Sequence, residues 1–203
     1  MLAEHILYST AIAILVGMVF LHYTGRDVSW IIILCAWAPD VDMLVSPVLR
    51  NLGFSIAFHG HRIAHGDFHN IAVMILFGIF MAFLLHPFGI RFFDSFIFSV
   101  IGFGAHLFED AAVYKVGYAF FWPLSSQVTG LGFLTQMQDE EFYLNNFFGI
   151  ANTDVLIIGL VFLLAAVLIR THFEGKSWVR WYMPDKVYAK LVGKKPQANE
   201  TKS

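Results

Sequence analysis

The sequence predicts an all-α membrane protein: a polytopic bundle of about five transmembrane helices followed by a basic juxtamembrane C-terminal helix. Composition is the first reason. Of the 203 residues, 58% are hydrophobic and only 14% are charged, and the mean hydropathy is +0.65. A soluble domain carries about 25% charged residues, and so short a chain cannot bury this much apolar surface inside itself. We therefore expect an integral protein of the cell (inner or plasma) membrane, with the lipid bilayer as its solvent.

The length of the apolar stretches is the second reason. Each is near the roughly 20 residues that a spanning helix needs, and they cover residues 6–21, 28–45, 70–88, 92–114 and 153–170. Pro39 interrupts the second stretch, which ends with two aspartates. Residues 115–152 lack a sustained hydrophobic period, so we expect a loop with short interfacial helices there.

The distribution of positive charge predicts the orientation. Eight of the 13 Lys and Arg residues lie from Arg170 onward, and positively charged flanks of membrane helices stay cytoplasmic. A helix over residues 177–192 should lie along anionic lipid headgroups. The net charge of −2 gives no indication of a nucleic-acid partner. An odd number of spans puts the two ends of a chain on opposite sides of the membrane. With five spans and a cytoplasmic C-terminus, the starts of the first and the fifth helix therefore lie on the extracytoplasmic face.

Ionisable residues gather where that face would lie. Consecutive spanning helices are antiparallel, so the start of the first, the end of the second, the start of the third and the end of the fourth share one face. The residues at these places are His5, Asp40, Asp42, His61, His65, His69, His106 and Asp110. The three central histidines are spaced four apart, as are the last His and Asp, which puts each set on one face of a helix.

These residue types suit a divalent metal. A carboxylate near hydrocarbon is costly unless a cation compensates its charge. Imidazole with carboxylate favours zinc, with manganese, iron or nickel as alternatives, over calcium or magnesium. Eight candidate ligands exceed the four of a single zinc site, so one or two ions are expected. The plainer interpretation is a solvated pair of aspartates, an interfacial His5 and a hydrogen-bonded His106–Asp110 pair.

Four motifs resemble a known family. AEHILYSTAIAI, PDVD, HNIAV and HLFEDAAVYKVGYAFFWPLS occur in this order within about residues 1–126. Together they resemble the LexA-binding, YdjM-like family of inner-membrane metal-dependent hydrolases. The resemblance implies metal ligation by His5, the two PDVD aspartates, His69 and the HxxxD pair. The family's histidine pair is spaced five apart, whereas HGHRIAHGDFHN offers only spacings of four, so His61 and His65 both remain open as its first histidine.

The resemblance also shapes the functional hypotheses. A weaker similarity in ligand order to zinc phospholipase C and P1-type nucleases implies that a phosphoester or related bond of an amphiphilic substrate is hydrolysed by a metal-activated water. Arg62 is a candidate for holding a phosphate, or for pairing with Asp67. Glu109 is a candidate general base, or a merely paired carboxylate. The alternatives to a hydrolase are a metal or ion transporter and a membrane scaffold with a structural metal.

The expected domain organisation has four parts. They are a metal-dependent hydrolase-like membrane domain over residues 1–126, an interfacial loop over 127–152, a final transmembrane helix over 153–170 and a basic cytoplasmic tail over 171–203.

Overall fold

The computed structural model describes residues 2–54, 57–58, 61–62, 65–113, 118–133, 153–184 and 187–189. Over these residues the regular secondary structure is helical apart from one short antiparallel ladder, in which β1 (Ala57–Phe58) pairs with β2 (His61–Arg62). Residues 118–133 form turns and loop with one isolated bridge, between Tyr118 and Thr129. Five segments are long and apolar enough to cross a membrane, and they are Ala3–Thr24, Trp30–Leu49, Ile71–Phe88, Phe92–Val113 and Thr153–Tyr182. The predicted all-α class and the predicted number of spans are confirmed.

Four of the five segments are continuous helices. They are α1 (Leu2–Thr24), α4 (Ile71–Leu85), α5 (Phe92–Val113) and α7 (Thr153–Glu174). Two of them continue as 3-10 helices, with η2 (His86–Phe88) after α4 and η3 (Gly175–Tyr182) after α7. Their outer faces expose large apolar side chains, as expected of surfaces that contact lipid.

The second segment is broken in the middle. It consists of α2 (Trp30–Cys35), the 3-10 turn η1 (Pro39–Val41) and α3 (Asp42–Asn51). Proline lacks the N–H that an α-helix interior needs, and its ring collides with the preceding turn. The expectation that this span simply ends at the aspartates is therefore wrong. Asp40 and Asp42 lie at the break, and the chain continues beyond them as a second helix.

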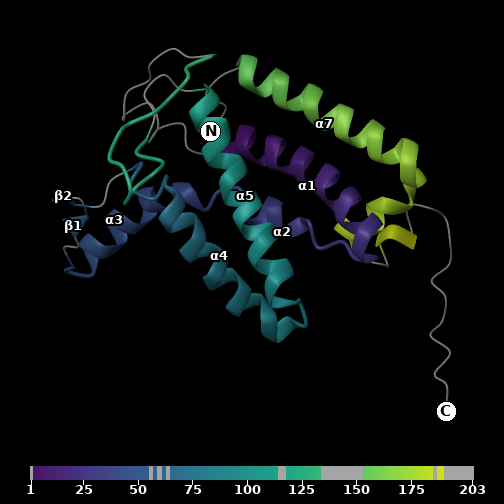
Figure 1. Cartoon of the computed structure of the whole chain (residues 1–203), viewed down its shortest axis with the longest axis horizontal. Coiled ribbons are helices and arrows are strands. Elements are labelled where there is room, and N and C mark those ends of the chain that lie inside the picture. Colours follow the sequence, from purple (N-terminus) through teal and green to yellow (C-terminus); the bar gives the residue numbers. More distant parts are fainter. Residues whose placement is uncertain are drawn as a thin grey trace.

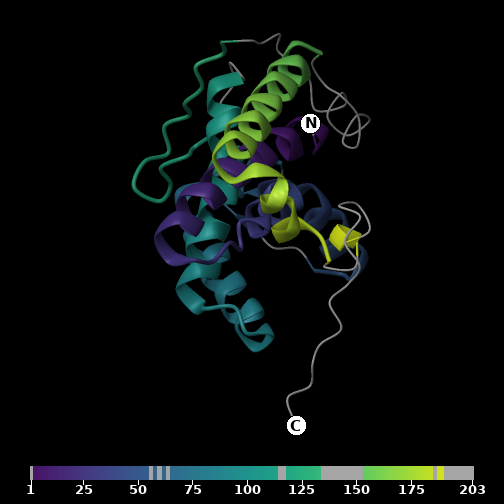
Figure 2. The same ribbon diagram turned by 90° about the vertical axis from the view of Figure 1, so that its right-hand side faces the viewer.

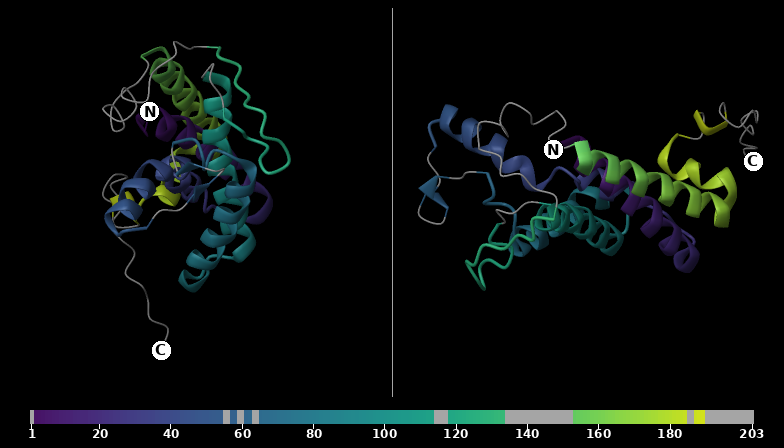
Figure 3. Two further views of the ribbon diagram at one scale, coloured as in Figure 1. Left: turned by 90° about the vertical axis from the view of Figure 1, so that its left-hand side faces the viewer. Right: turned by 90° about the horizontal axis from the view of Figure 1, so that it is seen from above.

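The helices pack as two pairs joined by α2. Helices α1 and α7 run side by side in the same direction, whereas α4 and α5 form an antiparallel hairpin (Figure 1). Seen from above, α5 lies beside α1, so the two pairs are in contact (right-hand view of Figure 3). Helix α2 fills the space between α1 and α5, and the core there includes Ala13, Ile31, Ile32 and Phe98.

A glycine lets α5 approach α2 closely. A Cβ atom on Gly102 would lie 2.6 Å from the carbonyl oxygen of Ile32 and 3.0 Å from the Cβ of Cys35. Close backbone approach at small residues is the usual way in which helices associate in lipid. This contact fixes the position of α5 along α2, one turn before His106.

At the far end of α1, a buried polar network ties η3 to the bundle. The Arg170 side chain is fully buried and donates to Asp27 Oδ2 at 2.6 Å, to the Ile14 carbonyl at 3.2 Å and to the Tyr182 hydroxyl at 3.1 Å. The Tyr182 hydroxyl in turn donates to the Ala13 carbonyl at 3.0 Å. The network therefore crosses α7, α1 and η3 and fixes where the C-terminal segment leaves the bundle.

The first part of the predicted juxtamembrane helix is therefore η3. This segment carries basic residues and also packs against the bundle. Lys176 and Arg180 are exposed, whereas Trp178 is buried against α1 and α7. Most of the predicted tail after Pro184 lies outside the described residues.

We expect Arg170→Leu to destabilise the protein strongly, because it leaves the Asp27 carboxylate buried without its guanidinium partner. Removing one partner of a buried ion pair typically costs about 3–5 kcal/mol. Thermal unfolding in detergent should occur at a clearly lower temperature than for wild type. Arg180→Leu is the control, since Arg180 is exposed. Removing both charges, in Asp27→Leu with Arg170→Leu, should recover part of the loss, and failure to do so would contradict this account.

We also expect Gly102→Ala to cost about 1–3 kcal/mol through overpacking, because the new methyl group meets backbone atoms of α2. Gly104→Ala is the matched control. Two residues along the same helix, its Cβ would meet only the flexible end of Met74, at 3.3 Å. The comparison is made by thermal unfolding, and equal unfolding temperatures for the two variants would refute the close-approach argument.

Candidate metal centre

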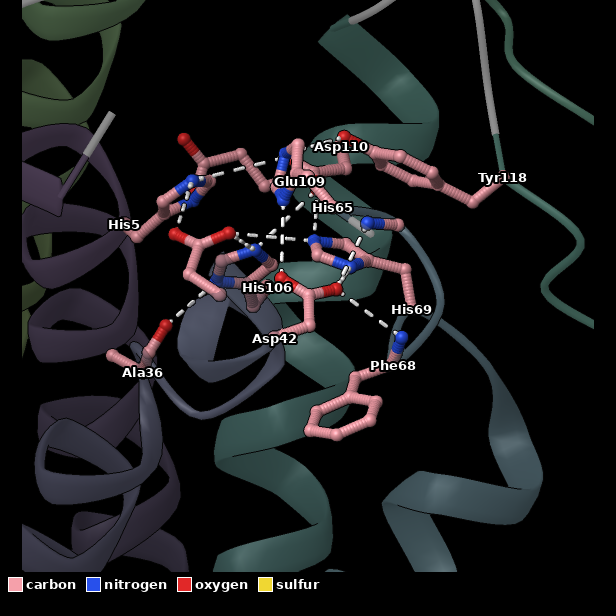
Figure 4. A network of polar contacts seen from close by, with 12 residues as sticks. His5, Ala36, Asp42, His65, Phe68, His69, His106, Glu109, Asp110 and Tyr118 are labelled. Carbon is pink, nitrogen blue, oxygen red and sulfur yellow. Dashed lines mark hydrogen bonds and ion pairs between the residues drawn. The ribbon is translucent and has the colours of Figure 1, made fainter. Parts of the chain in front are cut away.

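Residues from four separate parts of the chain meet at the break between α2 and α3 (Figure 4). His5 comes from the first turn of α1, Asp40 from η1, His69 from the turn before α4, and His106 and Asp110 from the end of α5. Each of the five is at most 5% exposed. The convergence expected from alternating helix direction is therefore present. These five residues include the groups that could hold a metal ion, and for brevity we call them the metal cluster.

The turn that carries His69 is fixed by its own sequence. The Asn70 side chain accepts a hydrogen bond from the Val73 N–H at 2.9 Å, which caps the start of α4. The same side chain donates to the Asp67 carbonyl at 2.8 Å. His69 is therefore held immediately before a capped helix, with little freedom to move.

Nitrogen and oxygen atoms in the cluster face one another across short gaps. His69 Nε2 lies 3.4 Å from Asp40 Oδ1 and 3.3 Å from Asp110 Oδ2. His106 Nε2 lies 3.5 Å and 3.4 Å from the same two oxygens. These separations exceed the roughly 2.7–3.2 Å of a good N–H···O hydrogen bond. The four side chains therefore surround a common point without satisfying one another.

Four buried polar atoms of the metal cluster lack a hydrogen-bond partner within the described part of the chain. They are both ring nitrogens of His69, Nε2 of His106 and Oδ1 of Asp110, and all are buried. Buried polar atoms are almost always paired, so each exception requires an explanation. A bound cation would explain one nitrogen of each imidazole and a carboxylate oxygen of Asp110, since His69, His106 and Asp110 each offer one ligand atom within 4.8 Å of the others.

Three sets of potential ligand atoms each fit within 4.8 Å. They are His5–Asp40–His106, Asp40–His65–His69 and His69–His106–Asp110. Because neighbouring sets share a residue, the arrangement can hold a divalent metal as one ion or as two adjacent ions.

Outer partners orient two of the imidazoles. His106 Nδ1 donates to the Ala36 carbonyl at 2.7 Å, and His5 Nδ1 lies 2.9 Å from Glu109 Oε2. When Nδ1 carries the proton, Nε2 presents a lone pair to the cluster. Metal-binding histidines usually have such a carbonyl or carboxylate behind them. Glu109, predicted as a general base, thus lies behind His5 with its side chain buried.

Both carboxylate oxygens of Asp42 contact the turn that carries His65 and His69. Its Oδ2 accepts hydrogen bonds from the backbone N–H of Gly66 at 2.8 Å and of Phe68 at 3.2 Å. Its Oδ1 lies 3.2 Å from His65 Nδ1. Asp42 belongs to none of the three ligand sets. Direct metal binding by Asp42 stays a prediction, and the observed geometry is that of a residue that positions His65 and His69.

Tyr118 was not anticipated from the sequence. Its hydroxyl lies 3.1 Å from His65 Nε2, and its ring centre is 4.2 Å from that of His69. Gly66, at a φ of +100°, permits this contact, because a Cβ there would come within 2.7 Å of the Tyr118 ring. The available signal was its place in the motif HLFEDAAVYKVGYAFFWPLS, after the HxxxD pair. The side chains of His61 and Arg62 lie outside the described residues.

The charge balance also favours a cation. Burial by itself disfavours a charged imidazole, yet the carboxylates of Asp110, Asp40 and Asp42 outweigh it and raise the pKa of His69 well above its usual value. The surroundings therefore attract a positive charge at His69. Metal binding requires a neutral imidazole, so protons and a metal ion would compete for this residue.

The comparisons agree with this architecture. Residues 1–178 match the family described as YdjM inner membrane protein, so the match extends past residue 126, where the four motifs end. No curated protein and no solved structure matches the chain. The family match covers every residue of the metal cluster and confirms the resemblance seen in the motifs. The chain therefore belongs to the YdjM inner membrane protein family and is an integral membrane protein.

Proposed function

We propose that this protein is a membrane-embedded, metal-dependent hydrolase that cleaves a phosphoester or related bond of an amphiphilic substrate. The observation that carries the proposal is that His69, His106 and Asp110 have buried atoms without hydrogen-bond partners and can each offer one ligand atom within 4.8 Å of the others. Imidazole and carboxylate ligands favour zinc, with manganese, iron or nickel as alternatives.

The proposed roles follow from these positions. The five residues of the metal cluster, with His65, would hold the ion, and Asp42 and Glu109 would hold the ligands in place. A bound divalent ion would polarise a phosphoryl oxygen and activate a water molecule. Arg62, which precedes the histidine turn, is proposed to bind the phosphate. The basic tail is proposed to contact anionic headgroups in the cytoplasm, which places the cluster towards the extracytoplasmic side of a five-span protein.

One observation favours a metal or ion transporter instead. The cluster lies at a break in a membrane-spanning segment, and transporters often bind ions where helices are interrupted. Against transport, the ligands are tied to the bundle by outer hydrogen bonds, and the sequence shows no internal repeat. A membrane scaffold with a structural metal is the remaining alternative.

The direct test is metal content together with turnover. We expect purified wild-type protein to hold a stoichiometric divalent metal and to hydrolyse bis(4-nitrophenyl) phosphate in detergent. His106→Ala and Asp110→Asn should each lose both the metal and the activity, because each removes a buried ligand. His86→Ala is the control, since this exposed histidine lies in η2, away from the cluster.

The outcomes separate the candidate functions. Stoichiometric metal without turnover, combined with metal flux into liposomes, would replace the hydrolase with a transporter. Stoichiometric metal with neither turnover nor flux would indicate a structural ion. A metal content unaffected by either cluster variant would rule out this site.

Glu109 can be tested through the pair Glu109→Gln and Glu109→Ala. If it orients His5, the Gln amide oxygen can still accept the His5 N–H, so we expect near-normal metal affinity and most of the turnover. Glu109→Ala should weaken metal binding by roughly 10–100-fold, as is typical for loss of an outer partner. Metal titration and hydrolysis rates give the answer. A Gln variant that keeps its metal but loses about 10²–10⁴ in rate would instead identify Glu109 as the general base.

A further inference from the structure

An apolar groove lies beside the metal cluster, between α4, α5 and the segment 118–133. Its cavity of about 480 Å³ is lined by residues that include Ile71, Met74, Leu107, Ala111, Phe120 and Leu131. A second cavity of about 410 Å³ continues along α4 and shares Ile71 and Phe121 with the first. Binding sites for small molecules commonly measure about 300–1,000 Å³, so the first cavity alone is large enough for a ligand.

The wall formed by residues 118–133 is fixed to the bundle. The Leu131 N–H donates to the Ala111 carbonyl at 2.7 Å, and the Ile71 N–H donates to the Phe120 carbonyl at 2.9 Å. Figure 2 shows this segment running back alongside α5. The segment contains no charged residue, and Leu124 is 93% exposed. An uncharged segment with exposed apolar side chains suits contact with lipid rather than with water.

Tyr118 connects the groove to the metal cluster. Its ring contacts that of His69 on one side, and its ring centre lies 5.9 Å from that of Phe120 on the other. Phe120 and Leu107 pack together next to Tyr118, and both line the groove. Tyr118 therefore contacts both the lining of the groove and a residue of the cluster.

The chemistry of the lining selects the ligand. The groove lies between membrane-spanning helices and is lined almost entirely by apolar side chains, so its natural occupant is an alkyl chain. A chain moving from the bilayer into this groove gains no hydrophobic transfer energy, because both surroundings are apolar. What a shaped groove can provide is position, since holding the chain places the attached polar group near the metal cluster.

We propose that this groove seats one alkyl chain of a bilayer amphiphile whose phosphate-bearing head lies at the metal cluster. The inference rests on the proposed function and sharpens it, because it makes the substrate a lipid-like phosphoester that enters from the bilayer between α4, α5 and the segment 118–133.

A pair of chromogenic esters tests the preference for a chain. We expect kcat/KM for hexadecyl 4-nitrophenyl phosphate to exceed that for methyl 4-nitrophenyl phosphate by at least about tenfold, the lower end of what an apolar pocket achieves. Ala111→Trp, which fills the groove, should lower this ratio. Leu160→Trp on the exposed face of α7 should leave the ratio unchanged. Equal use of both esters by wild type would overturn the proposal.

A binding measurement on the wild type, independent of turnover, completes the test. Hexadecyl phosphate carrying a terminal diazirine is crosslinked to the protein in detergent, and the labelled residues are mapped by mass spectrometry. We expect labelling to concentrate on Met74, Phe121 and Leu131, and unlabelled hexadecyl phosphate to compete with it. Labelling spread equally over the groove and α7 would indicate ordinary lipid contact and would overturn the proposal.

The two measurements also separate this inference from the proposed function. Groove labelling without hydrolysis of either ester supports the chain site and contradicts the hydrolase. Hydrolysis without a chain preference or groove labelling supports the hydrolase and contradicts the chain site.

Discussion

The structure depends on the need to compensate buried charge in an apolar bundle. An ionised side chain surrounded by helices and lipid is costly unless an opposite charge or several hydrogen bonds satisfy it. At the metal cluster, Asp40 and Asp110 each face both His69 and His106. Asp40 lies in η1, His69 lies before α4, and the other two residues lie in α5. The break at Pro39 places Asp40 within the bundle, and the close approach at Gly102 holds α5, with its histidine and aspartate, against α2. The same two backbone features therefore shape the bundle and assemble the site.

The two ends of the bundle meet this requirement in different ways. At the C-terminal end of α1, Asp27 accepts hydrogen bonds from the backbone and hydroxyl of Ser29 and from Arg170, so the protein supplies the cation itself. At the opposite end, the described residues place no Lys or Arg against Asp40 or Asp110, and buried atoms of His69 remain without a hydrogen-bond partner. The first arrangement is complete and therefore structural. The second leaves buried atoms without hydrogen-bond partners among the described residues, as is expected of a site that could hold a cation.

Much of this could be predicted from the sequence, and the exceptions have physical reasons. Helix direction alone brings His5 and His106 together, because each lies near the end of an apolar stretch of spanning length. The continuation of the second span as α3 was missed, because a proline followed closely by two aspartates is also the usual pattern of a helix end. The His5–Glu109 contact joins residues 104 positions apart, which no local period can reveal. Arg170 was grouped with the cytoplasmic tail, because a buried arginine at a helix end has the same sequence pattern as an exposed one.

The way in which the ligands are held bears on the choice between hydrolysis and transport. A transporter must open its site to each side in turn, so its ligands have to move relative to one another. Here Asp42 ties the histidine turn to the start of α3 through two backbone N–H groups, and His106 is tied to α2 through the Ala36 carbonyl. Separating these elements would leave several buried polar groups unpaired at the same time, at about 1–3 kcal/mol for each. Rigid ligands are a burden for transport but an advantage for catalysis, where groups fixed before the reaction need no reorganisation.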